Sequence, residues 1–316
     1  MLITANKSAY LTDFRYIEAA TAAMPGVEVK MVSRGQKYSD YINEFLADVG
    51  ADKVYYENTR TSVAEHKAFS EAINATLLPL DNALMYLRAE KQTFELENMK
   101  KAQKITDAAF ADLLGVIRPG MTEKEIAAEL IYRLYKFGAD NLSFDPIVVS
   151  GENGSKPHGV PGERKVSNGD FITMDFGVIY NGYCSDMTRT VAIGKVSDEM
   201  ESVYNIVLEA QKIGLENARA GVKWSDVDGL VRQFITDKGY GECFGHGLGH
   251  GLGLEIHEPL DFDPDRPGIT PINGVVSVEP GIYIPGKFGI RIEDCVILQE
   301  NGNFDLTASP KELISL

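Results

Sequence analysis

The chain has 316 residues, of which 44% are hydrophobic and 24% are charged, a composition typical of a soluble globular protein with a large core. Its formal net charge of -15 argues against non-specific binding to nucleic acid or to an anionic membrane surface. There is no apolar run of membrane-spanning length and no signal-peptide layout. The cysteines Cys184, Cys243 and Cys295 are widely spaced and are expected to be reduced and buried, so we expect a cytoplasmic protein.

The first part of the chain alternates between strand-like and helix-like segments. Strands are expected within residues 2–12, 27–32 and 53–56, and helices over residues 17–23, 38–49 and 62–75. Such alternation predicts a small α/β domain, which we place at residues 1–88. It contains no nucleotide-binding fingerprint.

Residues 89–316 are expected to form one α+β domain built from two related halves. A long amphipathic helix over residues 90–114 is followed by Thr122-x-x-Glu125, a capping box that opens a second helix to about Phe137. The same layout recurs later at a constant spacing, which predicts an internal duplication with a pseudo-two-fold axis. The matching positions are Arg118, Gly120, Ile126, Leu130, Leu134 and Gly138, paired with Arg219, Gly221, Val227, Val231, Ile235 and Gly239.

Each half ends in a strand pair that carries carboxylates where a sheet favours apolar residues. Residues 171–180 and 183–193 are joined by Asn181-Gly182, a strong hairpin signal, and residues 275–284 precede residues 290–298. A buried carboxylate is costly unless it is paired or binds a metal. The acids in question are Asp175, Asp186, Glu279 and Glu293.

Residues 245–258 hold three of the five histidines, His246, His250 and His257, interleaved with glycines that allow a close approach to the backbone. Four carboxylates and a histidine at a duplication axis predict a site for two divalent cations, with manganese, cobalt and zinc as candidates. Two such ions can bridge a water, lower its pKa and deliver hydroxide to a carbonyl, which predicts hydrolysis. Nearby, Glu258 is expected to be structural, and Glu255 to be a solvated charge.

Five segments together resemble the pita-bread metallopeptidases, the family of aminopeptidase P, prolidase and methionine aminopeptidase. They are residues 174–177, 185–190, 247–259, 278–281 and 291–294, and the resemblance extends over roughly residues 90–316. It implies that Asp175 binds one metal, that Asp186 and Glu293 bridge both, and that His250 and Glu279 bind the other. Glu279 would also sit beside the attacking water as a general base.

The resemblance also implies roles for residues that do not bind metal. His257 corresponds to a catalytic histidine that touches the scissile carbonyl or the proline, and His246 to one that lines the substrate pocket. His158 follows a loop, residues 150–154, that resembles the one placing a further substrate histidine. Arg291 corresponds to an arginine that holds the ligand carboxylates. The structural alternatives are a loop histidine without a role at His158 and a buried structural histidine at His246.

The small first domain and His257-Glu258-Pro259 resemble the proline-specific branch of that family. The resemblance implies an Xaa-Pro aminopeptidase that uses two divalent ions, manganese being the first expectation, on peptides with proline in the second position. It also implies a homodimer, and it makes the first domain look short at its start. Two alternatives stay open: an Xaa-Pro dipeptidase (prolidase) with the same ligands, and a catalytically silent pita-bread binding module.

Overall fold

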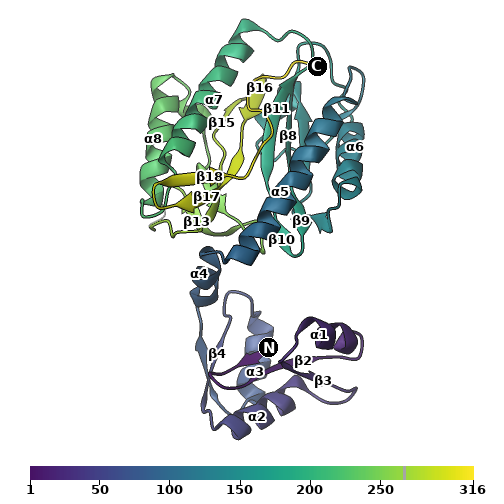
Figure 1. The fold of residues 1–316 in the computed structure, drawn as a ribbon, viewed down its shortest axis with the longest axis vertical. Coiled ribbons are helices and arrows are strands. Elements are labelled where there is room, and N and C mark those ends of the chain that lie inside the picture. The colour runs from purple at the N-terminus through teal and green to yellow at the C-terminus, as the bar shows by residue number, and fades with distance from the viewer. Residues whose placement is uncertain (266–267) are drawn as a thin grey trace. The chain divides into compact units, whose positions relative to one another are not determined.

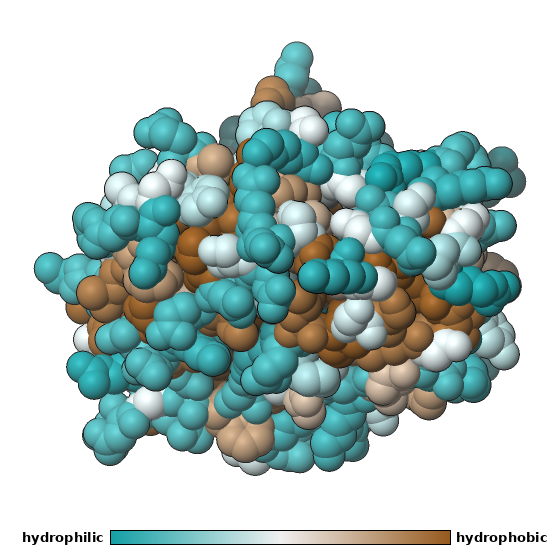
Figure 2. All heavy atoms as spheres, turned by 90° about the horizontal axis from the view of Figure 1, so that it is seen from above, coloured by the Kyte–Doolittle hydropathy of each residue, from teal (hydrophilic) through white to brown (hydrophobic). Residues whose placement is uncertain are grey.

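The computed structural model describes residues 1–265 and 268–316, and the chain divides into two compact units, Met1–Leu84 and Met85–Leu316 (Figure 1). The domain boundary predicted after residue 88 lies within helix α4 (Ala83–Ala89). None of the described helices is long and apolar enough to cross a membrane. On the face shown in Figure 2, hydrophilic side chains cover much of the surface and hydrophobic patches lie between them.

The first unit is the predicted α/β domain. Strands β1 (Leu2–Ile3), β2 (Ser8–Thr12) and β3 (Glu28–Met31) form one sheet, and β4 (Lys53–Tyr56) pairs with β5 (Thr76–Pro79). The β2–β3 and β4–β5 pairs are parallel, which requires a crossover between the partners. Helices α1 (Ile17–Ala23) and α3 (Val63–Ala72) provide these crossovers, while α2 (Tyr38–Val49) lies between β3 and β4 in the chain.

The first half of the second unit places two helices over an antiparallel sheet. Helix α5 (Thr93–Leu114) packs on α6 (Glu123–Lys136), whose predicted capping box is formed by Thr122 and Glu125. Their apolar faces share one core with strands β7 (Ile147–Ser150), β8 (Phe171–Phe176) and β11 (Met187–Ala192), which run in the order β11-β8-β7. The remaining elements are β6 (Asn141–Leu142), η1 (Gly151–Ser155), β9 (Val178–Tyr180) and β10 (Tyr183–Cys184).

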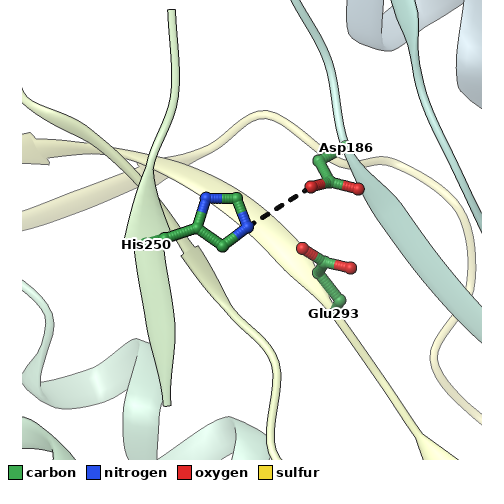
Figure 3. Close-up of side chains that lie close together, drawn as sticks. All are labelled: Asp186, His250 and Glu293. Carbon is green, nitrogen blue, oxygen red and sulfur yellow. Dashed lines mark ion pairs between the residues drawn. The ribbon is translucent and has the colours of Figure 1, made fainter. Parts of the chain in front are cut away.

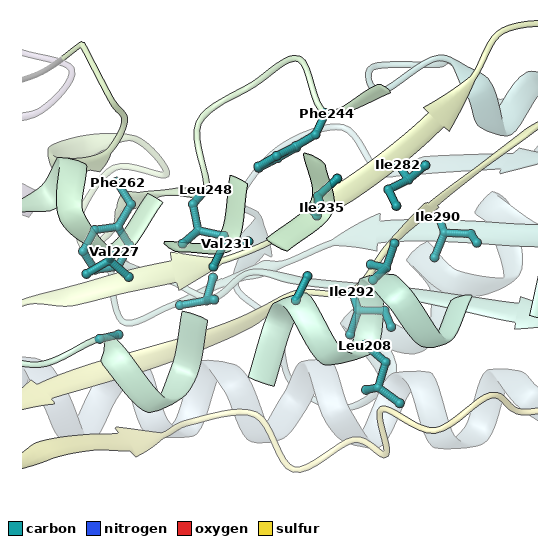
Figure 4. Close-up of a cluster of buried hydrophobic side chains, with 14 of the residues drawn as sticks. Leu208, Val227, Val231, Ile235, Phe244, Leu248, Phe262, Ile282, Ile290 and Ile292 are labelled. Atoms are coloured by element: carbon teal, nitrogen blue, oxygen red, sulfur yellow. The ribbon is translucent and has the colours of Figure 1, made fainter. Parts of the chain in front are cut away.

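The second half repeats this order of two helices followed by strands, as the repeated sequence pattern predicted. Helix α7 (Asp198–Asn217) packs on α8 (Trp224–Asp237), followed by η2 (Gly241–Cys243). A sheet in the order β13-β12-β14-β17-β18 comprises Glu258–Phe262, Gly249–Gly251, Val275–Val278, Asp294–Gln299 and Gly302–Asp305. Figure 4 shows its core, in which Val227, Val231 and Ile235 of α8 belong to one cluster with Leu248 and Phe262.

The hairpin turn predicted at Asn181-Gly182 is confirmed, but both predicted strand pairs are divided. Residues 171–180 form β8 and β9, and residues 183–193 form β10 and β11. Asn181 and Gly182 have φ values of 48° and 84°, and Tyr180 pairs with Tyr183 across this turn. Residues 275–284 form two strands, β14 and β15 (Gly281–Ile284), and residues 290–298 divide between β16 (Phe288–Arg291) and β17. The prediction of continuous strands was therefore wrong.

These breaks coincide with the carboxylates. Glu279 lies between β14 and β15, Glu293 between β16 and β17, and Asp186 between β10 and β11. Pro280 follows Glu279 and has no N–H to donate to a sheet ladder, which favours the first break. The interruptions take these three acids out of regular strand pairing, whereas Asp175 stays within β8 and pairs with Thr188. The three cysteines are free as expected, although Cys243 is only half-buried.

Candidate metal centre

Every residue predicted for the site lines one cavity of about 540 Å³ in the second unit. The cavity draws residues from both halves, so its composition agrees with a site at the duplication axis. The predicted residues on its wall are Asp175, Asp186, His250, Glu279 and Glu293, together with Arg291, His158, His246 and His257.

Three of these side chains form a tight group. One ligand atom each from Asp186, His250 and Glu293 lies within 4.8 Å of the others. Figure 3 shows the His250 ring directed at the two carboxylates, with its Nε2 atom 3.6 Å from Asp186 Oδ2. Glu279 lies beside the same group, because its Oε1 atom is 3.4 Å from the same Nε2 atom.

The remaining carboxylates are oriented by hydrogen bonds. Arg291 Nη2 donates to Asp175 Oδ2 over 2.5 Å, and its Nε atom lies 3.9 Å from Glu279 Oε2. Ser277 Oγ donates to Glu279 Oε1 over 2.9 Å. Thr188, which pairs with Asp175 across β8 and β11, donates its hydroxyl to Glu293 Oε2 over 2.7 Å. The acids are thus held in place by neighbours that leave other oxygen atoms available.

The donor set fits divalent cations. Burial raises the pKa of Asp175, Asp186 and Glu293, and the charges of neighbouring carboxylates raise these pKa values further. The Oδ1 atoms of Asp175 and Asp186 are buried and have no hydrogen-bond partner among the described residues. Buried, unpaired carboxylate oxygens are unfavourable, and a bound cation would reverse the local preference for the protonated form.

The glycines around His250 are explained by close backbone packing. A Cβ atom on Gly249 would lie 2.0 Å from the carbonyl oxygen of Ser277, so a larger residue would push β12 away from β14. The backbone N–H of His250 donates to Ser277 Oγ over 2.9 Å, and this hydroxyl also bonds Glu279. The glycine-rich run therefore brings His250 close enough to β14 for the Ser277 hydroxyl to bond both the His250 backbone and the Glu279 carboxylate.

The three cavity histidines outside the metal group occupy different environments. His246 is half-buried, with Nε2 3.0 Å from the Tyr283 hydroxyl and Nδ1 2.8 Å from the Gly247 carbonyl oxygen. Burial lowers the pKa of His246 and of His257, which favours neutral imidazoles. The rings of His257 and His250 have centroids 4.4 Å apart. His158 is exposed on the cavity wall.

Sequence reasoning missed several supporting residues. Thr188 could have been found, because it follows Asp186 by two positions and strand alternation puts both on one face. Tyr283 bonds both Arg291 Nη1, over 2.8 Å, and His246, but no pattern pointed to it. Glu255, expected to be solvated, is only partly exposed, with its Oε2 atom 3.5 Å from Arg88 Nη2, so that expectation was wrong.

A cavity with clustered carboxylates, neutral imidazoles and an arginine that orients the acids defines a metal-dependent hydrolase site, and comparison with known proteins gives its family. The chain belongs to metallopeptidase family M24, whose model matches residues 97–300, and it has the pita-bread fold of that family. Residues 1–89 match the creatinase/prolidase N-terminal domain. The protein is therefore a metallopeptidase, and its family implies divalent metal ions.

Three relatives illustrate the similarity. The uncharacterized peptidase YqhT of Bacillus subtilis (strain 168) is 40% identical over 316 residues, covering 100% of this chain and 89% of that protein. An Xaa-Pro dipeptidase structure from Bacillus anthracis has a TM-score of 0.96 at 43% identity, covering 99% of this chain and 88% of that chain. The X-Pro aminopeptidase structure from Thermotoga maritima MSB8 has a TM-score of 0.93 at 41% identity, covering 99% and 89%.

Proposed function

We propose that this metallopeptidase hydrolyses the peptide bond between an N-terminal residue and proline, as an Xaa-Pro aminopeptidase. The observation that carries the proposal is the convergence of the four predicted carboxylate ligands and four histidines on one cavity. A volume of about 540 Å³ lies within the range of small-ligand pockets, which is roughly 300–1,000 Å³, so a short peptide is a suitable occupant.

In this proposal the divalent ions are held by Asp175, Asp186, His250, Glu279 and Glu293. Two bound ions would supply a water of lowered pKa and would polarise the substrate carbonyl. Manganese is the first candidate because oxygen donors outnumber nitrogen donors and no cysteine lines the cavity among the described residues. Cobalt and zinc are the alternatives.

The chain itself would provide proton transfer and orientation. Glu279 is the candidate general base, since its carboxylate is held by Ser277 beside His250 and can accept a proton from the attacking water. His257 and His158 are the candidates for hydrogen bonds to the reacting peptide unit, and His246 for binding the substrate further along. A neutral imidazole can donate from one nitrogen and accept at the other.

The preference for proline is supported by the apolar part of the cavity. Pro157, Val160 and Pro161 lie on the wall around His158, and Phe144, Ile147 and Ile256 add further apolar surface. A pyrrolidine ring is apolar, lacks an N–H and fixes the backbone, so this wall can accept it without an unpaired donor. The similar structures from Bacillus anthracis and Thermotoga maritima are named for action on Xaa-Pro substrates.

Dipeptidase action is the second candidate, because the Bacillus anthracis structure with a TM-score of 0.96 is named an Xaa-Pro dipeptidase. The two activities use the same ligands. They differ in the group beyond proline: a dipeptidase must bind the free carboxylate of that residue, whereas an aminopeptidase must admit a further peptide unit.

The test is hydrolysis of Ala-Pro beside Ala-Pro-Ala by protein reconstituted with manganese, with a chelator-treated sample as control. Cleavage of the tripeptide supports the aminopeptidase. Cleavage of the dipeptide alone replaces it with the dipeptidase. If neither peptide is cut although metal is bound, the proposal of Xaa-Pro cleavage fails, and if no stoichiometric metal binds, a catalytically silent module is the better description.

A further inference from the structure

His257, the candidate catalytic histidine, is followed directly by a buried carboxylate that does not line the cavity. The side chain of Glu258 is 1% exposed, and that of Lys91, its partner, is also 1% exposed. Lys91 Nζ donates to Glu258 Oε2 over 2.8 Å and to the Arg88 carbonyl oxygen over 2.7 Å. The Arg88 guanidinium donates to the other oxygen, Oε1. One carboxylate thus binds two cationic side chains, one from the last turn of α4 and one from the segment that joins α4 to α5.

The loop that carries His257 is folded around this ion pair. The backbone N–H of Glu255 donates to Glu258 Oε1 over 3.2 Å, and that of Gly253 donates to the Glu255 carbonyl oxygen over 2.9 Å. A Cβ atom on Gly253 would lie 2.7 Å from Glu258 Oε2 and 2.8 Å from Lys91 Cε. A side chain at position 253 would therefore have to displace Glu258 or Lys91 from this ion pair.

The other end of the loop is fixed by the sheet. Glu258 pairs with Gly251 in the ladder between β12 and β13, one position from His250, and the register shifts between His250 and Gly251. His257 lies in the bend directly before β13, on the cavity wall against the His250 ring. The side chain of Glu258, the first residue of β13, is bound instead to Lys91 and Arg88.

We propose that the ion-pair cluster of Glu258, Lys91 and Arg88 is a positioning device that fixes His257 for the reaction. The inference rests on the proposed function of His257 and adds residues that lie outside the cavity. A buried ion pair is weak support for stability, because desolvation of both charges offsets their attraction. Here it fixes the direction in which a short loop leaves the metal group, and small displacements of a catalytic group can cost about 100-fold in rate.

The charge state of the cluster agrees with a permanent anchor. Burial alone would raise the pKa of Glu258, but the charges and hydrogen bonds of Lys91 and Arg88 outweigh it and lower that pKa. Burial lowers the pKa of Lys91, and Glu258 opposes this change. At neutral pH the Glu258 carboxylate is therefore ionised. Lys91 Nζ donates hydrogen bonds to two oxygen atoms, one of them of this carboxylate.

The test is a double-mutant cycle between Lys91→Met and His257→Ala in the metal-loaded full chain, with turnover of the better of the two Xaa-Pro peptides as readout. Lys91→Met keeps an unbranched side chain, one atom shorter, and removes its charge. We expect it to lower kcat about 10- to 100-fold while the bound metal per chain stays at the wild-type value. In the His257→Ala background the same substitution should have almost no further effect, because the group that it positions is already absent.

Two further variants make the result specific. Lys100→Met removes a lysine of α5 that pairs with Glu97 at the surface, and it should leave turnover unchanged. Glu258→Gln keeps an oxygen acceptor for the backbone N–H of Glu255 but removes the negative charge that binds Lys91 and Arg88. If Lys91→Met does not fold, the double-mutant cycle with His257→Ala is repeated with Glu258→Gln. Equal losses from Lys91→Met with and without His257 would overturn the inference, as would wild-type turnover in both anchor variants. If wild-type protein itself cuts neither peptide, the proposed function has failed instead.

Discussion

Glu293 and Asp294 are adjacent buried acids with opposite surroundings. Thr188 donates a hydrogen bond to the Glu293 carboxylate, whose charged neighbours include Glu279, Asp175 and, as a weaker opposing influence, Arg291. Asp294 is fully buried away from the cavity, where it accepts from Arg189 Nη2 over 2.7 Å and from Gln211 Nε2 over 2.7 Å and also pairs with Lys311. Burial and like charges therefore dominate at Glu293, whereas Asp294 is paired directly with Arg189 and Lys311.

This contrast predicts different outcomes for two isosteric substitutions. Glu293→Gln should lose at least one metal ion and nearly all turnover while the metal-free protein keeps its stability, because the variant removes a repelling charge. Asp294→Asn should keep both metals but lower the free energy of unfolding by about 3–5 kcal/mol, because Arg189 loses its buried counter-charge. Metal analysis and chemical denaturation of the two variants check this. Full activity of Glu293→Gln would remove that residue from the site.

At the scale of elements, helix α8 holds the segment that carries His246. Arg232 Nη1 and Nη2 donate to the carbonyl oxygens of Phe244, over 2.9 Å, and His246, over 2.7 Å. Asp228, fully buried one turn earlier, accepts from Arg232 and from the backbone N–H of Leu248 over 3.0 Å. The guanidinium also lies 4.4 Å from the centre of the Phe244 ring. A single helix turn thus sets the path of residues 244–248.

Arg232→Lys should loosen this segment, because an ammonium group cannot reproduce the planar fork that bonds two carbonyl oxygens and Asp228. If His246 contacts substrate, the expected result is a KM about tenfold higher, with metal content unchanged. Gln233→Met, at the next position of α8, removes an exposed hydrogen bond to Asp237 and serves as the control. Steady-state kinetics give the KM of both variants. An unchanged KM in Arg232→Lys would argue against a substrate role for His246.

Elements with strong local signals were predictable from the sequence, whereas the residues that hold the site side chains in place were not. The α6 capping box and the Asn181-Gly182 turn depend on residues close in the chain, and both are present as expected. The division of residues 275–284 into two strands depends on pairing with β17 and β16, which is a tertiary property. Tyr283 and Lys91 likewise gain their contacts from residues distant in sequence, so no local pattern could identify them.

At the scale of the whole molecule, the two halves bring their carboxylates to a shared cavity that each half alone would leave incomplete. Asp175 and Asp186 come from the first half, and Glu279 and Glu293 from the second. The halves are also joined at this place by the bond from Glu293 N–H to the Thr188 carbonyl oxygen, over 3.1 Å. Mutual repulsion of these acids therefore acts across the contact between the halves, and bound cations would turn it into attraction.

This arrangement makes stability depend jointly on pH and metal. Burial raises the pKa of Asp186 and Glu293 above their values in an unfolded chain, so the folded metal-free protein binds more protons than the unfolded one. Its free energy of unfolding should therefore fall as the pH rises from the ordinary carboxyl range through the raised pKa values. Cations compete with these protons, so the increase in Tm on adding manganese to chelated protein should grow between about pH 5 and pH 8.

Thermal unfolding of chelated and manganese-loaded protein over this pH range measures both effects, and Asp186→Asn provides the internal control. The variant lacks one of the repelling acids, so its metal-free Tm should depend less on pH, and manganese should raise it less. A Tm that responds equally to manganese in wild type and variant would place the bound ion elsewhere. A metal-free Tm that increases toward neutral pH would mean that the carboxylates are paired with positive groups within the fold. The contact between the two halves would then be stable without bound cations.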